Sequence, residues 1–318
     1  METKESGERE IAHDFSPLMI IYKDGTIKRL QGIQTVPPVQ VAGEASSKDV
    51  IYSSQLNLRC RVYVPGNLSP GQKLPLLVYY HGGAFALSSP FSPIYHSYVV
   101  SLVKEANVVA VSVDYRLAPE NPIPAAYDDS WAALEWVAAH CRGDGPEEWL
   151  NSYADLSNVF LAGDSAGANI CHCMCTRNAE EDLDGVRIVG CALINPFFWG
   201  NDPVGNEPTE KETREFPEKI WKFVSPASDG CNDRRINPHL DPRFGVLSCR
   251  KVLVVVAELD LLRDRGVLYY EKLRENQWDG VVEFMEVHGE QHVFHLFDTN
   301  NEKAIDMLKR VASFIKED

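Results

Sequence analysis

The chain has 318 residues, of which 44% are hydrophobic, and carries 31 Lys and Arg against 46 Asp and Glu, for a formal net charge of −15. This acidity disfavours nucleic acids and anionic membranes as partners, because both are negatively charged themselves. No run approaches the ~18 apolar residues of a membrane helix, and the first apolar cluster, Leu18–Tyr22, is too short for a signal core. We therefore expect a cytoplasmic protein without membrane contact, whose 8 cysteines are reduced.

Apolar runs alternate with helical patterns along most of the chain. A short hairpin is expected first, with Met19–Tyr22 and Thr26–Leu30 on either side of Lys23–Gly25. This alternation predicts an α/β fold, with a mostly parallel sheet and helices on both faces. The expected strands are Leu56–Val64, Leu74–Tyr80, Val108–Asp114, Val159–Ala162, Val186–Ile194, Val252–Ala257 and Val281–Val287, and the helical patterns include Ala126–Cys141, Arg265–Asn276 and Asn301–Ile315.

Two segments depart from this alternation. The residues before about Gln40 precede the first expected strand of the sheet. The stretch from Asn195 to Arg250 is interrupted by 7 prolines, which break helices and strands alike. We predict one domain over residues 1–318, with a cap formed by about residues 1–40 and by an insertion at about residues 195–250.

The segment Gly163-Asp164-Ser165-Ala166-Gly167 places a serine between two glycines directly after an apolar run. A strand-to-helix turn this sharp has no room for Cβ atoms two residues on either side of the serine. The pattern is typical of a nucleophile elbow, which holds a serine Oγ exposed at the tip of a strand. Asp164 is expected to support this elbow by hydrogen bonding.

A second motif, His81-Gly82-Gly83-Ala84, follows the expected strand Leu74–Tyr80. A loop at this place supplies backbone N–H groups to a negatively charged oxygen. We expect Gly83, Ala84 and Ala166 to donate these groups, Gly82 to let the loop approach closely, and His81 to orient the loop.

A serine nucleophile requires a base and an acid that orients the base, and in this architecture they follow as Asp and then His. Asp260 comes after the run Val252–Ala257, and His292 after Val281–Val287. Because parallel strands end at one edge of a sheet, Ser165, Asp260 and His292 are predicted to meet there. Asp264 is the alternative acid, and His288 and His295 are the alternative bases.

With these residues the chain resembles plant carboxylesterases of the hormone-sensitive-lipase-like branch of the α/β-hydrolases. The resemblance covers almost the whole length and implies an α/β-hydrolase domain. It favours Asp260 and His292 over their neighbours. The segments that carry it are His81–Gly83, Asp114–Glu120, Pro124–Asp129, Gly163–Asn169, Asp260–Asp264 and His292–Phe294.

This resemblance implies a serine-dependent carboxylesterase that forms an acyl-enzyme, needs no cofactor and hydrolyses a small-molecule ester, expected to be a plant specialised metabolite. The same branch contains hydroxyisoflavanone dehydratases, alkaloid cyclases and gibberellin receptors. Elimination or cyclisation in the same pocket is therefore one alternative, supported by a likeness to the dehydratases at Asn195–Gly200. Hormone binding without catalysis is another, although the receptors lack the histidine that this chain retains as His292.

The aromatic residues Phe197, Trp199 and Trp221 are expected to wall the substrate pocket. The segment Cys171–Cys175 contains three cysteines and a histidine, yet on a helix Cys171 and Cys175 share a face from which Cys173 points away. We therefore predict no metal site. The sequence leaves the identity of the ester and the oligomeric state open.

Overall fold

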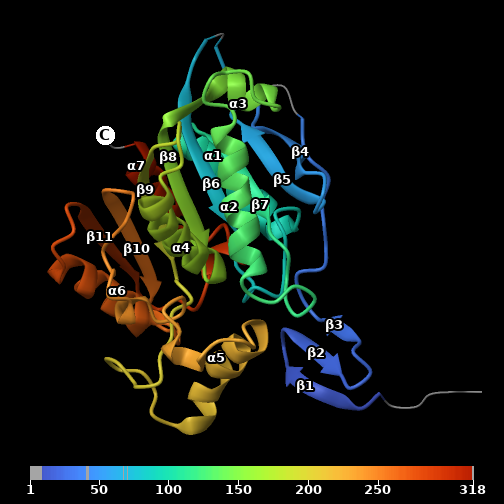
Figure 1. Ribbon diagram of the computed structural model, residues 1–318, viewed down its shortest axis with the longest axis vertical. Helices are drawn as coiled ribbons and strands as arrows, with labels where there is room; N and C mark the ends of the chain where they lie inside the picture. Colours follow the sequence, from blue (N-terminus) through green and yellow to red (C-terminus); the bar gives the residue numbers. More distant parts are fainter. Residues whose placement is uncertain (1–8, 41–42, 67, 70, 317–318) are drawn as a thin grey trace, which may run out of the picture.

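The computed structural model describes residues 9–40, 43–66, 68–69 and 71–316 (Figure 1). Its centre is an eight-stranded sheet with the order β11-β10-β9-β8-β6-β7-β5-β4. All neighbouring pairs from β7 to β11 are parallel, whereas β5 runs antiparallel to both β4 and β7. The strands are β4 (Ser46–Ser53), β5 (Leu58–Val64), β6 (Leu74–Tyr80), β7 (Val109–Asp114), β8 (Ala154–Asp164), β9 (Ile188–Ile194), β10 (Lys251–Ala257) and β11 (Val281–Val287).

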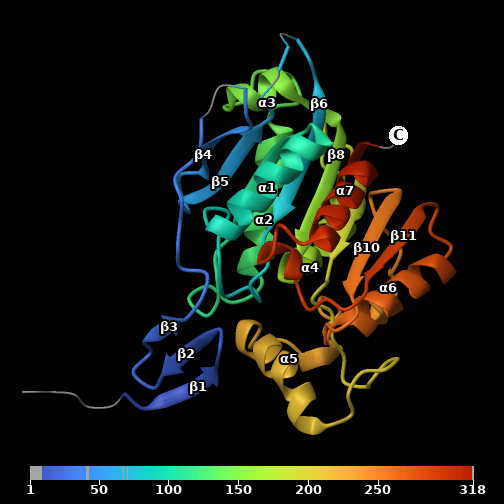
Figure 2. The same cartoon turned by 180° about the vertical axis from the view of Figure 1, so that it is seen from behind.

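Helices cover both faces of this sheet, as Figures 1 and 2 show from opposite sides. One face carries α1 (Pro93–Ala106) and α7 (Glu302–Lys316), and the other carries α2 (Ala125–Ala138), α4 (Ala166–Glu181) and α6 (Arg263–Glu275). Each face has its own buried apolar cluster, because the strands are apolar on both sides. The predicted α/β fold with a mostly parallel sheet is confirmed. Among the described helices we find no candidate for a membrane span.

Several elements were not predicted from the sequence. Strand β4 is an edge strand with mostly exposed or half-buried residues, so it lacks the apolar run that marks a central strand. Helix α5 (Lys211–Val224) forms although Pro217 lies within it, because Ile220, Trp221 and Val224 bury one side of the helix. Four short helical elements were also not predicted: α3 (Glu148–Tyr153), η1 (Gly230–Asn232), η2 (Pro238–Leu240) and η3 (Phe294–Leu296).

The N-terminal residues form a separate antiparallel sheet of β1 (Ile11–Phe15), β2 (Met19–Tyr22) and β3 (Ile27–Arg29). The predicted hairpin is confirmed as β2 and β3, and residues 1–8 of the predicted cap lie outside the described residues. Arg29 attaches this sheet to the main body, because its guanidinium donates to Glu120 (2.8 Å) and to the carbonyl oxygens of Ala86 (2.7 Å) and Ala118 (3.0 Å). Both views show it beside α5 at one end of the molecule (Figures 1 and 2).

Candidate active site

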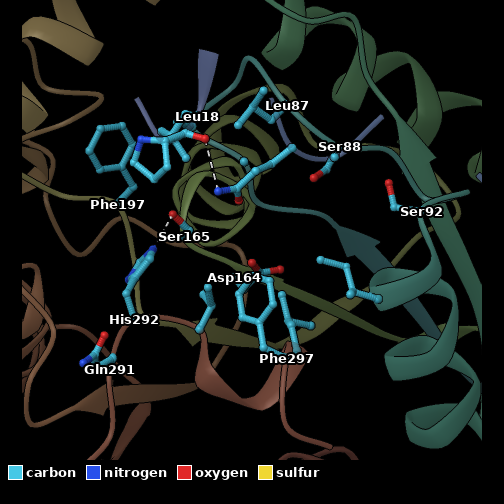
Figure 3. A pocket seen from close by; sticks show the side chains of 18 of the residues that line it. Leu18, Leu87, Ser88, Ser92, Asp164, Ser165, Phe197, Gln291, His292 and Phe297 are labelled. Atoms are coloured by element: carbon cyan, nitrogen blue, oxygen red, sulfur yellow. Dashed lines mark hydrogen bonds between the residues drawn. The ribbon is translucent and has the colours of Figure 1, made fainter. Parts of the chain in front are cut away.

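Three side chains meet where β8, β10 and β11 end. Nε2 of His292 lies 2.9 Å from Oγ of Ser165 (Figure 3). Nδ1 of His292 lies 2.7 Å from Oδ2 of Asp260. Ser165 directly follows β8, Asp260 follows β10, and His292 follows β11. The parallel strands therefore bring together residues that are up to 127 positions apart in the chain.

The turn at Ser165 is a tight one, with φ 51° and ψ −116°, a conformation that non-glycine residues rarely adopt. Both flanking glycines are required by close backbone contacts. A Cβ atom at Gly163 would lie 2.5 Å from the carbonyl carbon of Gly167, and one at Gly167 would overlap the carbonyl oxygen of Tyr80. Helix α4 thus begins in direct backbone contact with the end of β6, and the turn holds Ser165 at the edge of the sheet.

Asp260 is oriented by donors other than the histidine. Its Oδ2 also accepts a hydrogen bond from the amide of Asn195 (3.1 Å), and its Oδ1 accepts one from the N–H of Leu262 (2.9 Å). Burial lowers the pKa of His292, but the charge and the hydrogen bond of Asp260 outweigh it and hold this pKa above the usual value. With Nδ1–H donating to Asp260, Nε2 is the nitrogen that can accept the proton of Ser165.

The alternative acid and bases lie elsewhere. Asp264 accepts a hydrogen bond from the N–H of Asn206 (3.0 Å) and pairs with Arg263. His288 is exposed, 3.6 Å from Glu258. His295 is buried edge-on against Tyr98, and burial lowers the pKa of His295 to about 3. Asp264 and His288 therefore face other charged groups, and His295 packs against the ring of Tyr98.

The loop after β6 supplies unpaired backbone donors beside Ser165. In the described part of the chain, the N–H groups of Gly83, Ala84 and Ala166 donate no hydrogen bond to a protein acceptor. The N–H of Gly82 instead donates to the hydroxyl of Tyr95 at 2.9 Å. Gly82 therefore lets the loop pack closely against Asp164 and Tyr95, but its N–H group does not face the cavity. The free N–H groups have the chemistry needed to bind a negatively charged oxygen.

A cavity of about 720 Å³ opens in front of Ser165. Figure 3 shows Phe197, Ser165 and His292 on one side of it and Ser88 and Ser92 on the other. Its wall combines the N-terminal sheet, α1, α5 and the loops after β10 and β11. Other lining residues include Leu18, Leu30, Ile33, Leu87, Ile94, Phe216, Ile220, Leu259, Leu261, Leu296 and Phe297.

The structure corrects the prediction for two of the three aromatic residues. Phe197 lines the cavity, but Trp199 and Trp221 are fully buried and do not line it. Trp199 packs against the guanidinium groups of Arg214 and Arg265, at 4.8 Å and 5.5 Å from its ring centre. Trp221 packs edge-on against Phe85, 6.1 Å between ring centres. Both indoles therefore help attach residues 195–250 to the main body.

All eight cysteines are free thiols. Cys171 and Cys175 are buried, with Cys191 as a common neighbour on β9, whereas Cys173 lies beside Asn169. Among the described residues, no group of three or more His, Cys, Asp or Glu side chains is arranged to hold a metal ion.

Comparison with known proteins identifies the family. A family model described as the α/β-hydrolase fold matches residues 77–296, more than half of the chain. The chain belongs to the α/β-hydrolase family. The match includes the loop after β6, the turn at Ser165, and the positions of Asp260 and His292.

The sequence alignments of this α/β-hydrolase with individual relatives extend over nearly its whole length. It is 48% identical to a protein of Arabidopsis thaliana named probable carboxylesterase 13, over 98% of this chain and 99% of the relative. It is 41% identical to 2-hydroxyisoflavanone dehydratase of Glycyrrhiza echinata, over 98% of each chain. Among solved structures, the thermostable carboxylesterase EstE1 superimposes with a TM-score of 0.71 at 28% identity, over 90% of each chain.

Some residues of the site were not found from the sequence. Asn195 follows β9 at the same sheet edge as Asp260, and that position was a usable signal. Gln31 and Tyr95 carried no such signal. They line the cavity because the N-terminal sheet and α1 pack there, and neither residue belongs to a motif.

The close contact at Gly167 gives a testable prediction. Gly167→Ala should lower the free energy of unfolding by at least about 3 kcal/mol, because its Cβ would overlap the backbone of β6. Gly143→Ala is the control: Gly143, unlike Gly167, has a positive φ (77°), and a Cβ there meets nothing within 4 Å, so only the backbone strain of about 1 kcal/mol is expected. Urea unfolding measures both. Equal losses would show that the contact is not what requires Gly167.

Proposed function

We infer that this protein is a serine-dependent carboxylesterase. The observation that carries this inference is the hydrogen-bonded chain from Ser165 through His292 to Asp260, beside free backbone N–H groups. A relative named probable carboxylesterase covers 98% of the chain, and structural neighbours over 25% identical are esterases, which supports the same activity. No step in the reaction below requires a cofactor.

In the first half of the reaction, Oγ of Ser165 attacks the carbonyl carbon of the ester while Nε2 of His292 takes the serine proton. Asp260 stays ionised and stabilises the imidazolium that forms. The negative charge that develops on the carbonyl oxygen is bound by the N–H groups of Gly83, Ala84 and Ala166. The bond to the alcohol then breaks, and His292 returns the proton to the leaving oxygen.

In the second half, water attacks the acyl group on Ser165. His292 takes a proton from this water and delivers it to Oγ as the carboxylic acid leaves. Because Asp260 favours the protonated imidazole, His292 binds this proton more firmly than a free histidine does.

We propose that the substrate is an uncharged, largely apolar small-molecule ester, as expected of a plant specialised metabolite. The described residues that line the cavity include no Lys, Arg or Glu, and the acidic ones are Asp164 and Asp260. Leu259, Ile33 and Phe297 expose 60%, 65% and 67% of their surface and also line the cavity. An apolar group of the substrate would be buried here, whereas a carboxylate would find no positive partner.

Two further proposals concern the domain organisation and the cellular location of the protein. The single-domain organisation with a cap of residues 1–40 and 195–250 stays a prediction, supported by the cavity residues that both segments contribute. A cytoplasmic location also stays a prediction. The eight free thiols are compatible with a reducing compartment.

A second candidate reaction is elimination, because the chain is 41% identical to a 2-hydroxyisoflavanone dehydratase. In that reaction the backbone N–H groups would polarise a carbonyl group and His292 would transfer the proton, without acylation of Ser165. Hormone binding without catalysis has less support, since the chain keeps the hydrogen-bonded pair of Ser165 and His292 that ester hydrolysis needs.

The two reactions differ in how Ser165 and His292 depend on each other. For ester hydrolysis, Ser165→Ala, His292→Ala and the double variant should each lose at least about 10⁴-fold in kcat, because the pair acts as one unit. Ser101→Ala, on the exposed side of α1, serves as the control and should keep full turnover. Steady-state kinetics with p-nitrophenyl hexanoate measures this. Near-normal turnover of the natural substrate by Ser165→Ala, with none by His292→Ala, would establish elimination instead.

Substrate charge is tested with matched esters. The kcat/KM for mono-p-nitrophenyl adipate should be at least about 100-fold below that for p-nitrophenyl hexanoate, because its terminal carboxylate would lie unpaired in the apolar cavity. Capping this carboxylate as a methyl ester should restore the rate, which controls for length. Similar rates for the charged and capped esters would contradict the proposed substrate class.

A further inference from the structure

The peptide group between Gly82 and Gly83 is held by side chains that take no part in proton transfer. Nδ1 of His81 lies 2.7 Å from the carbonyl oxygen of Gly82 and donates to it. The hydroxyl of Tyr115 lies 2.7 Å from the preceding carbonyl oxygen, that of His81, and 3.2 Å from that of Gly82. In a trans peptide the C=O and the following N–H point in opposite directions. Holding the Gly82 carbonyl therefore sets the direction in which the N–H of Gly83 points.

The other end of Gly82 is held by Tyr95, in the first turn of α1. The N–H of Gly82 donates to the Tyr95 hydroxyl at 2.9 Å, and this hydroxyl donates to Oδ2 of Asp164 at 2.9 Å. A Cβ atom at Gly82 would lie 2.9 Å from the Tyr95 hydroxyl oxygen and would overlap Oδ2 of Asp164. The loop therefore packs directly against this pair of side chains.

The chemistry of the three groups sets the direction of both hydrogen bonds. An ionised carboxylate only accepts, and a tyrosine hydroxyl has a single hydrogen to donate. With that hydrogen committed to Asp164, the hydroxyl oxygen is left to accept the N–H of Gly82. Asp164 directly precedes Ser165, so the chain Gly82–Tyr95–Asp164 connects the oxyanion loop to the turn that holds the nucleophile.

The side chains that donate hydrogen bonds to Asp164 are neutral tyrosine hydroxyls. Its other oxygen, Oδ1, accepts a hydrogen bond from Tyr79 at 2.8 Å, and its side chain is fully buried. Burial raises the pKa of Asp164 to about 6, against the opposing effect of the two tyrosine hydrogen bonds. Burying an ionised carboxylate without a cationic hydrogen-bond partner costs free energy. Asp164 takes no part in the proton transfer from Ser165 to His292, so this cost points to another role for Asp164.

We propose that Tyr95 is a positioning residue for the oxyanion hole: it holds the Gly82 peptide against Asp164, so that the N–H of Gly83 faces the reacting carbonyl. This role rests on the esterase function proposed above. Tyr95 touches neither Ser165 nor His292 through any hydrogen bond, so it acts on the reaction through the loop.

The chain offers a matched control for this role. Tyr79 and Tyr95 are both buried and both donate to Asp164, but only Tyr95 also accepts from the loop. Tyr95→Phe should lower kcat for p-nitrophenyl hexanoate by about 10- to 100-fold with KM changed less than about twofold, because misdirected donors weaken transition-state binding only. Tyr79→Phe should change kcat by less than about threefold, although it removes a hydrogen bond to the same carboxylate.

A second readout separates positioning from general loss of structure. A trifluoromethyl ketone adds to the serine and places an oxyanion in the hole, so its inhibition constant should rise in Tyr95→Phe by the same factor as kcat falls. Melting temperatures of both variants are compared alongside. Equal kcat losses in the two variants, or a kcat loss in Tyr95→Phe without weaker inhibition, would overturn the role of Tyr95.

Asp164→Asn tests the same connection if Tyr95→Phe does not fold. Measured at a pH where kcat no longer changes, it should lose at least about 10-fold in kcat and bind the ketone correspondingly less tightly. Full activity of this variant would also overturn the role. Failure of the esterase function itself gives a different result, because the wild-type protein would then neither hydrolyse the ester nor bind the ketone.

Discussion

The backbone contact between helix α4 and strand β6 is the constraint on which the rest of the site depends. Gly167 lies against the carbonyl oxygen of Tyr80, the last residue of β6. Ser165 directly precedes helix α4, on one side of this contact. The loop that carries Gly83 and Ala84 directly follows β6, on the other side. A nucleophile and its oxyanion donors are thus brought together by main-chain packing, which fixes their distance better than flexible side chains can.

Two buried carboxylates beside this contact differ in their partners. Asp260 faces His292, which can become positively charged, whereas Asp164 faces the hydroxyls of Tyr79 and Tyr95, which cannot. Asp260 is therefore suited to stabilise the charge that appears during proton transfer, and Asp164 to hold neutral groups in place. Both carboxylates favour the protonated form of His292, so the electrostatics of the site are set by more than the hydrogen-bonded acid alone.

The fold followed from sequence because its central strands are continuous apolar runs. Ser165 and Asp260 could be placed at one sheet edge for the same reason, since each follows such a run, and His292 follows the partly apolar strand β11. Trp199 was misplaced because an aromatic residue in a proline-rich segment gives no sign of whether it packs on a cavity or between two arginines. Tyr95 could not be found, because its partners come from the loop after β6 and from the end of β8 and meet only through tertiary packing.

The central claim is that Ser165 becomes acylated during turnover. Wild-type protein mixed with p-nitrophenyl hexanoate can be quenched in acid within the first turnover, digested and analysed by mass spectrometry. We expect the peptide that contains Ser165 to gain the mass of one hexanoyl group, and the gain to disappear once the ester is consumed. Continued release of p-nitrophenol with no acylated peptide, or with the acyl group on another residue, would contradict the proposed mechanism.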